Sequence, residues 1–224
     1  LDQALSAGVI SSGAAAWDAG RVSTPTLARG ARSCACGVVI TASHNPAPYN
    51  GIKLWNPHGM AFDEDQQREI EDALDRNRFR SPAWDRIGAV SSRPDLVQEH
   101  VDSILKDVGP AKVRVAVDCG CGATCTITPF LLRQMGCEVI AMNAQADGHF
   151  PGRDPEPTEE NLAGLAATVR ATRADLGIAH DGDGDRMVAM DRAGTFVGGD
   201  VLLALFARRE VRRGLVVPVD ASMV

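Results

Sequence analysis

Short apolar segments suited to β-strands alternate with segments of helical periodicity along most of this sequence. The run from Gly37 to Ala42 is rich in β-branched residues, as in a strand buried on both faces of a parallel sheet. Residues 112–118, 137–142 and 175–179 are also expected to be strands, and a helix with an i, i+3, i+4, i+7 apolar stripe is predicted between the last two. This order predicts an α/β protein with repeated three-layer α/β/α domains and mixed, mostly parallel sheets.

The composition limits the partners of the chain. Aromatic residues make up 4% of its 224 residues, so the core must be aliphatic. The net charge of −6 argues against a nucleic-acid partner, for which a basic face is expected. No apolar run reaches membrane-spanning length and no signal peptide opens the chain. We therefore expect a cytoplasmic protein that binds neither nucleic acid nor membrane, and the sequence does not indicate its oligomeric state.

The segment Asp181-Gly182-Asp183-Gly184-Asp185-Arg186 carries three carboxylates at alternate positions. In an extended or tightly turned backbone, residues i, i+2 and i+4 point to the same side, so the three carboxylates can converge. Anions held this close repel each other unless a cation lies among them, and oxygen ligands of this kind suit Mg²⁺. Arg186 cannot bind a cation, so its guanidinium group is expected to bind a phosphate or a carboxylate.

Two other interpretations exist for this acidic segment. A solvated turn is the ordinary explanation for one pair of alternating aspartates. Here three alternating aspartates are followed by an arginine, and the segment comes directly after the apolar run 176–179. An EF-hand calcium loop also begins with alternating acidic residues, but it needs glycine at its sixth position and glutamate at its twelfth. Counted from Asp181, those positions hold Arg186 and Arg192, so the EF-hand interpretation fails.

A second candidate site follows the predicted strand 37–42. Ser43 stands at the carboxyl end of this strand, where ligands bind in open α/β sheets, and His44 is next to it. Pro46 and Pro48 prevent a helix from forming after these two residues, and Lys53 lies in the extended segment that follows. Each residue alone has an ordinary explanation: a turn serine, a surface imidazole and the solvent side of a strand. Together they place a hydroxyl, a titratable base and a cation close in sequence, which is typical of a catalytic site.

The cysteines include a cluster at positions 119, 121 and 125. Structural zinc sites use separated cysteine pairs with two to four residues between them, or cysteines with nearby histidines, and this cluster has neither. Small reduced thiols that fill tight turns are the better explanation. The turn at residues 119–124 also has a faint similarity to a phosphate-binding turn between a strand and a helix.

The pattern predicts three domains, of which the third is only begun. The first domain is residues 1–92 and carries the loop with Ser43 and His44, called the serine loop below. The second is residues 93–197 and carries the acidic segment 181–186, called the acidic loop below. The third is residues 198–224, with a helix and a strand at 215–219. The first residues, Leu1, Leu5 and Val9, already have helical spacing. The sequence thus begins inside one element and stops before its last unit closes, so we expect a fragment of a longer protein.

Two motifs resemble those of the α-D-phosphohexomutase superfamily. They are Thr41-Ala42-Ser43-His44-Asn45-Pro46, followed by Tyr49-Asn50-Gly51-Ile52-Lys53, and the acidic segment 181–186. A third segment, Pro151-Gly152-Arg153-Asp154-Pro155-Glu156-Pro157, is also similar to members of this superfamily. The first two motifs together are highly specific, and the resemblance runs over essentially the whole chain.

The resemblance implies a role for each matching residue. Ser43 would be the phosphoserine that donates and regains the phosphoryl group. Mg²⁺ would be held by the phosphate on Ser43 and by Asp181, Asp183 and Asp185. Lys53 would act in general acid/base catalysis at the sugar hydroxyl, and His44 lies in the same loop as the serine. Arg186 would contact the phosphate or the substrate.

Such an enzyme interconverts the 6-phosphate and the 1-phosphate of a hexose or hexosamine, with a hexose 1,6-bisphosphate as intermediate and activator. Glucosamine phosphate is the preferred candidate for the phosphosugar substrate, and mannose phosphate or glucose phosphate is the alternative. A non-catalytic module that binds a metal or a phosphosugar is the alternative from another class. Members of the superfamily have four domains, and their sugar-recognition and distal phosphate-binding loops are not found in this sequence. We therefore expect that the chain alone does not turn over.

Overall fold

The computed structural model describes residues 1–216 and divides the chain into two compact units. Unit 1 consists of residues 1–42 and 48–107, and unit 2 of residues 43–47 and everything from Val108 onward. The segment Ser43–Ala47 thus clusters with unit 2, although the residues on both sides of it belong to unit 1. The strand predicted at 215–219 lies largely outside the described residues.

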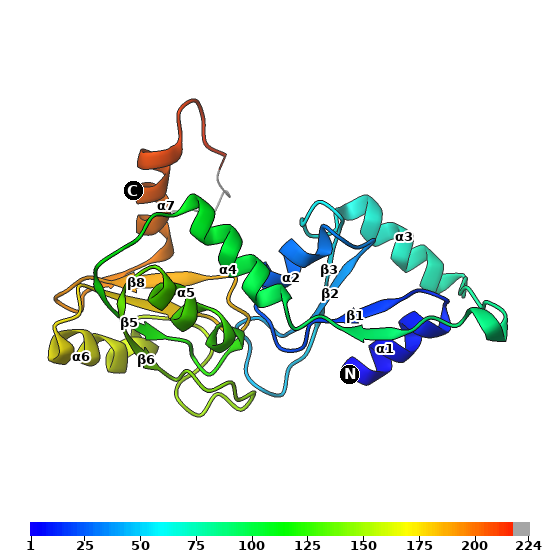
Figure 1. Ribbon diagram of the computed structural model, residues 1–224, viewed down its shortest axis with the longest axis horizontal. Helices are drawn as coiled ribbons and strands as arrows, with labels where there is room; N and C mark the ends of the chain where they lie inside the picture. Colours follow the sequence, from blue (N-terminus) through cyan, green and yellow to red (C-terminus); the bar gives the residue numbers. More distant parts are fainter. Residues whose placement is uncertain (217–224) are drawn as a thin grey trace. The chain divides into compact units, whose positions relative to one another are not determined.

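Unit 1 is built from short strands and the helices that connect them. Its elements are α1 (Asp2–Ser11), β1 (Ala16–Asp18), α2 (Thr24–Ala31), β2 (Gly37–Ile40), β3 (Ile52–Trp55), α3 (Glu64–Asp75), the 3₁₀ turn η1 (Trp84–Arg86), β4 (Val90–Ser92) and α4 (Leu96–Asp107) (Figure 1). β1 pairs in parallel with β4, a strand that the sequence does not predict. α4 packs on α2, and its Val101 is almost fully buried.

The prediction of a parallel sheet around residues 37–42 is wrong for the described part of the chain. β2 pairs antiparallel with β3, with Val39 opposite Lys53, and residues of β2 alternate between buried and half-buried. The connection from Ile40 to Ile52 contains no helix. A parallel pairing needs a longer crossover, usually a helix, whereas a short irregular connection returns the chain as an antiparallel neighbour.

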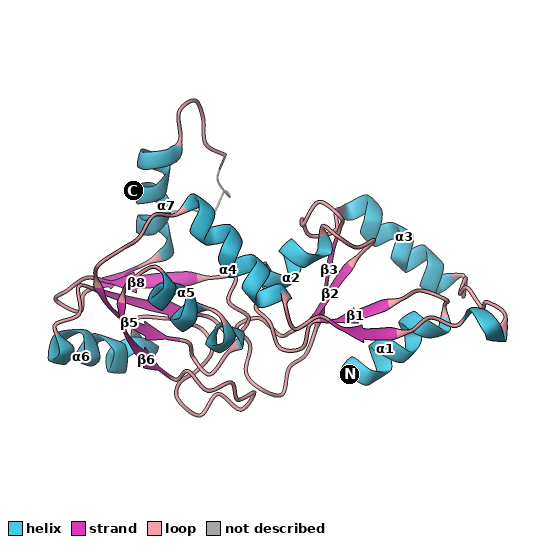
Figure 2. Ribbon diagram, in the orientation of Figure 1, coloured by secondary structure: helices cyan, strands magenta, loops and turns pink. Residues whose placement is uncertain are grey.

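Unit 2 is a mixed α/β layer structure. Its elements are β5 (Arg114–Asp118), the 3₁₀ turn η2 (Ala123–Thr126), α5 (Thr128–Gln134), β6 (Glu138–Met142), the 3₁₀ turn η3 (Glu160–Leu162), α6 (Ala163–Thr172), β7 (Leu176–His180), β8 (Met187–Met190), β9 (Phe196–Val197) and α7 (Gly199–Glu210). The strands form one sheet in the order β6–β5–β7–β8–β9, drawn in magenta in Figure 2. β5 is parallel to β6 and β7, whereas β8 and β9 are added antiparallel.

Neighbouring residues of β5 face opposite sides of this sheet and belong to different core clusters. Ala116 packs in a cluster with all four residues of the predicted apolar stripe, Leu162, Leu165, Ala166 and Val169. Val117 packs with Cys119 and Cys125, next to Leu132 of α5. α6 contacts β5 and β7, and α5 contacts β6, so helices cover both faces. The α/β class and the three-layer arrangement are confirmed for unit 2.

The register of the sheet fixes the place of the acidic loop. Asp118, the last residue of β5, is paired with Ala179 near the end of β7. Because the two strands are parallel, the turns that follow them leave the sheet at the same edge, where ligands bind in α/β folds. The turn at residues 119–124 after β5, called the cysteine turn below, and the acidic loop after β7 are therefore neighbours.

The last described helix, α7, contacts β8 of unit 2. Val201, Leu205 and Phe206 on this helix are exposed. The proposal that residue 198 begins a third domain stays a prediction. Within residues 1–216, no helix combines the length and apolar character that a membrane span requires.

Candidate functional site

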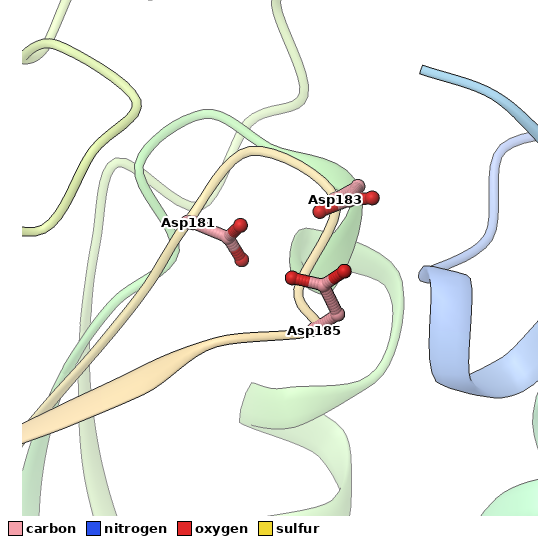
Figure 3. Close-up of side chains that lie close together, drawn as sticks. All are labelled: Asp181, Asp183 and Asp185. Atoms are coloured by element: carbon pink, nitrogen blue, oxygen red, sulfur yellow. The ribbon is translucent and has the colours of Figure 1, made fainter. Parts of the chain in front are cut away.

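The acidic loop between β7 and β8 brings three carboxylates together. Oxygen atoms of Asp181, Asp183 and Asp185 all lie within 4.8 Å of one another, and Figure 3 shows the side chains turned toward a common point. Asp181 and Asp183 are buried, and Asp185 is exposed. Oδ1 of Asp181 accepts hydrogen bonds from the backbone N–H groups of Gly184 at 3.0 Å and Arg186 at 3.1 Å. The first aspartate therefore closes the loop with its own side chain.

The surroundings of Asp181 favour a cation in this loop. Its Oδ2 atom is buried and accepts no hydrogen bond from residues 1–216. Burial, together with the charges of Asp183 and Asp185, raises the pKa of Asp181 to about 7, although the hydrogen bond from the Arg186 N–H group opposes this shift. A hard divalent cation would take Oδ2 as a ligand and remove the repulsion. The three aspartates are therefore arranged so that they could hold a divalent cation.

The raised pKa of Asp181 predicts how the metal-free chain responds to pH. The folded chain keeps a proton on Asp181 up to about pH 7, whereas the unfolded chain loses it near pH 4. Between these values the folded state binds more protons, so the free energy of unfolding falls as the pH rises. We expect a decrease of roughly 1–3 kcal/mol from this group, measured by urea unfolding in chelator. The Asp181→Asn variant should lack this component, and an equal decrease in the variant would assign it to other groups.

Gly182 lies where the acidic loop meets two other segments. Its carbonyl oxygen accepts a hydrogen bond from the N–H group of Ala123 in the cysteine turn, at 2.9 Å. A Cβ atom on Gly182 would lie 2.5 Å from the carbonyl oxygen of Ser43, and one on Gly122 would collide with the Gly182 carbonyl. Glycine is therefore required at both positions because backbone approaches backbone. The acidic loop is packed between the serine loop and the cysteine turn.

The Gly182→Ala variant is expected to lower the free energy of unfolding by roughly 1–3 kcal/mol, because the backbone of Ser43 must move. It should also weaken metal binding, since the loop cannot keep its shape. Gly148→Ala is a suitable control, because a Cβ atom there would meet nothing within 4 Å. Urea unfolding of both variants measures the effect. Equal stabilities for the two would show that the contact between the loops is not tight.

Ser43 adopts a backbone conformation that is uncommon for serine. Its φ angle is 57°, in the left-handed region, where strain often marks functional sites. Its Oγ atom lies 3.4 Å from Nδ1 of His44. The structure thus brings Ser43 and His44 beside the acidic loop. Lys53 belongs to unit 1, on β3, and its catalytic role stays a prediction.

Arg186 and His44 share an acidic partner that the sequence analysis did not single out. Nη1 of Arg186 donates to both carboxylate oxygens of Glu156, at 3.0 and 3.2 Å. Nδ1 of His44 lies 3.6 Å from Oε2 of the same carboxylate. The exposed fractions of these side chains are 49% for Arg186, 37% for His44 and 34% for Glu156. Glu156 therefore links the serine loop to the acidic loop.

A buried arginine holds the loop that carries Glu156. The Arg153 side chain, 5% exposed, has its Nε atom 3.1 Å from Oδ2 of Asp118. Its Nη2 atom donates to the carbonyl oxygen of His180 at 2.6 Å, and Nη1 donates to the carbonyl of Asp154 at 2.8 Å. Glu156 follows directly after the buried Pro155, so its backbone is fixed. The segment 151–157 is the sequence signal for this arrangement, but its residue types alone do not indicate these contacts.

His180 ties the two ends of the acidic loop to α5. Its Nδ1 atom lies 3.3 Å from the carbonyl oxygen of Arg186, and its Nε2 atom lies 3.1 Å from the hydroxyl of Thr128. A carbonyl can only accept, so Nδ1 carries the proton and Nε2 accepts from the threonine. Burial lowers the pKa of His180 and favours this neutral form. His180 thus acts as a support for the acidic loop.

The cysteine turn contains buried free thiols. Cys119, Cys121 and Cys125 are at most 8% exposed, and none belongs to a metal-binding group within the described residues. The carboxylate of Asp118 accepts the hydrogen bond of the Gly120 N–H group at 2.8 Å. This N–H group therefore already donates to an anionic side chain of the protein. These contacts agree with thiols that fill a tight turn and give no support to phosphate binding there.

Comparison with known proteins places both units in one group of enzymes. Residues 1–81 match the model of phosphoglucomutase/phosphomannomutase alpha/beta/alpha domain I, and residues 95–194 match the model of domain II. The chain is 54% identical to a "Probable phosphoglucosamine mutase" of Methanocella arvoryzae and 53% identical to one of Methanosarcina acetivorans. Each match covers 100% of this chain but only 51% and 52% of the relative, respectively. The chain thus spans about half the length of these curated relatives.

A solved structure gives the same result for the fold. The crystal structure of a phosphoglucomutase/phosphomannomutase family protein from Burkholderia thailandensis superposes with a TM-score of 0.82 at 30% sequence identity. The match covers 93% of this chain and 47% of that chain.

Proposed function

Because the chain belongs to the phosphoglucomutase/phosphomannomutase family, we propose that it carries the phosphoryl-transfer machinery of a phosphohexomutase. The observation that carries this proposal is the packing of the Ser43 carbonyl against Gly182 of the acidic loop, within one unit. A serine hydroxyl and a metal-binding group side by side suit a phosphoserine whose charge a cation offsets. The names of the relatives support glucosamine phosphate as the substrate, and mannose or glucose phosphate is the alternative.

A hexose 1,6-bisphosphate would first phosphorylate Ser43. The phosphoserine would then donate its phosphoryl group to the free 1-hydroxyl of a hexose 6-phosphate, which gives the 1,6-bisphosphate. After the bisphosphate reorients, Ser43 would take back the phosphoryl group from the 6-position, which leaves the hexose 1-phosphate. Mg²⁺ bound by the three aspartates would neutralise charge on the transferring group. Arg186 would bind phosphoryl oxygens with its guanidinium group, and His44 would support the serine loop. Lys53 is proposed as the general acid or base at the sugar hydroxyl.

We also propose that the 224-residue chain alone does not turn over. Its identified side chains address one phosphoryl group, whereas a sugar bisphosphate has two, and binding at the distant end contributes to orientation at the reacting centre. A fusion with the remaining half of the Methanocella arvoryzae relative would supply those contacts.

Isomerisation of glucosamine 6-phosphate, followed by phosphorus NMR in the presence of Mg²⁺ and glucose 1,6-bisphosphate, tests the function. We expect product from the fusion and none from the chain alone, and parallel assays with mannose and glucose phosphates rank the substrates. If the fusion folds and binds phosphosugar but forms no product, the non-catalytic alternative is correct.

A further inference from the structure

We propose that Glu156 is a positioning residue that competes with the phosphoryl group for Arg186. The Glu156 carboxylate binds the Arg186 guanidinium group when no phosphoryl group is present. When a phosphoryl group binds, it replaces the carboxylate as the partner of Arg186. The inference rests on the proposed function for its biological meaning, but the competition itself is a property of the three side chains Glu156, Arg186 and His44.

The contacts place Glu156 where the two loops meet. Its carboxylate receives both hydrogen bonds from Nη1 of Arg186, at 3.0 and 3.2 Å, and lies 3.6 Å from Nδ1 of His44. The same imidazole nitrogen is 3.4 Å from Oγ of Ser43. The backbone of Arg186 is anchored to Asp181 at 3.1 Å. A chain of contacts therefore runs from Arg186 of the acidic loop through Glu156 and His44 to the serine that would carry the phosphate.

The backbone around Glu156 is held by hydrogen bonds from two side chains. Arg153 donates to the carbonyl oxygens of Asp154 and Pro155, at 2.8 and 3.3 Å. The side-chain amide of Asn161 donates to the carbonyl of Glu156 at 2.9 Å. Pro155 and Pro157 on both sides are buried. A backbone held in this way limits the positions that the Glu156 carboxylate can take, which lowers the entropic cost of orienting Arg186.

The strength of the ion pair suits an exchangeable contact. The Arg186 and Glu156 side chains are 49% and 34% exposed, so water and salt weaken their attraction. A phosphoryl group carries more charge and more acceptor oxygens than a carboxylate, and it matches the guanidinium fork. The phosphoryl group should therefore displace the Glu156 carboxylate from Arg186. The carboxylate stays nearby and can bind Arg186 again when the phosphoryl group leaves. In the proposed reaction, the bisphosphate must leave and reorient, and such an exchange would ease its release.

Inorganic phosphate is the probe for this competition, titrated by calorimetry into the 224-residue chain at saturating Mg²⁺ and about 0.15 M salt. Glu156→Gln is expected to bind phosphate about three- to fivefold more tightly, since Arg186 loses its competing anion. Asp154→Asn is the matched control, because it removes one exposed carboxylate from the same loop. It should change the affinity by less than about 1.5-fold.

A double-mutant cycle separates competition from a structural effect. In the Arg186→Gln background, Glu156→Gln should no longer tighten phosphate binding, because the contested guanidinium group is absent. Unchanged or weaker binding by Glu156→Gln, equal effects of Glu156→Gln and Asp154→Asn, or an undiminished effect without Arg186 would each overturn the proposal. Should Glu156→Gln fail to fold, Glu156→Asp retains the charge, shortens the reach and is expected to tighten binding about twofold. Phosphate titration needs no turnover, so failure of the mutase assay leaves this test intact.

Discussion

Replacing Asp183 by asparagine is expected to lower the affinity of the chain for Mg²⁺ and Mn²⁺ by at least about 100-fold. The substitution keeps the shape of the side chain but removes one of three carboxylates whose oxygens lie within 4.8 Å of one another. Calorimetric titration of each cation measures the loss. Because the variant also removes a charge that repels Asp181, the metal-free protein should be at least as stable as the unmodified chain.

The stability measurement separates loss of a ligand from loss of the fold. Asp107→Asn is the control, since it removes an exposed carboxylate outside the acidic loop and should leave cation affinity unchanged. If Asp183→Asn binds either cation as tightly as the control does, this loop is not the metal site.

Replacing Ser43 by alanine is expected to prevent phosphorylation by glucose 1,6-bisphosphate. The serine has a left-handed backbone conformation, with φ 57°, and its carbonyl group packs against Gly182 of the acidic loop. No other hydroxyl is proposed to reach the metal-bound phosphoryl group. Intact-mass and peptide mass spectrometry should find one phosphate on the unmodified chain, on Ser43, and none on the variant. In the fusion protein, isomerase activity should fall by at least about 1000-fold.

Ser91→Ala is the control for this experiment, because Ser91 is an exposed serine on β4 of unit 1. It should be phosphorylated on Ser43 as readily as the unmodified chain. A phosphate located on another residue, or an equal amount of phosphate on Ser43→Ala, would contradict the assignment.

The acidic loop is the part of the site that sequence reasoning describes best. Asp181, Asp183 and Asp185 are close in sequence, so their alternation alone predicts that the side chains converge, and the structure agrees. Local pattern also indicates the apolar stripe of residues 162–169 and the strand that precedes the acidic loop. These features depend on neighbours along the chain and can therefore be read from it.

Features that depend on distant contacts could not be predicted in this way. The apolar run of β2 suits a buried parallel strand, but its pairing with β3 is decided by the connection between them. Glu156 and Arg153 are ordinary charged residues in a proline-rich loop, and only the folded chain brings Glu156 to Arg186 and Arg153 to Asp118. Their roles come from partners 30 and 35 positions away, which no local pattern specifies.

We expect the phosphate on Ser43 and the three aspartates to bind the same cation. The most direct measurement is the phosphorus NMR signal of the Ser43-phosphorylated chain during titration with Mn²⁺, whose unpaired electrons broaden nuclei only at close range. We predict that stoichiometric Mn²⁺ removes the phosphoserine signal in the unmodified chain, whereas the same addition leaves it largely intact in Asp183→Asn. A signal that stays sharp in the unmodified chain, or that broadens equally in the variant, would show that serine and acidic loop do not form one site.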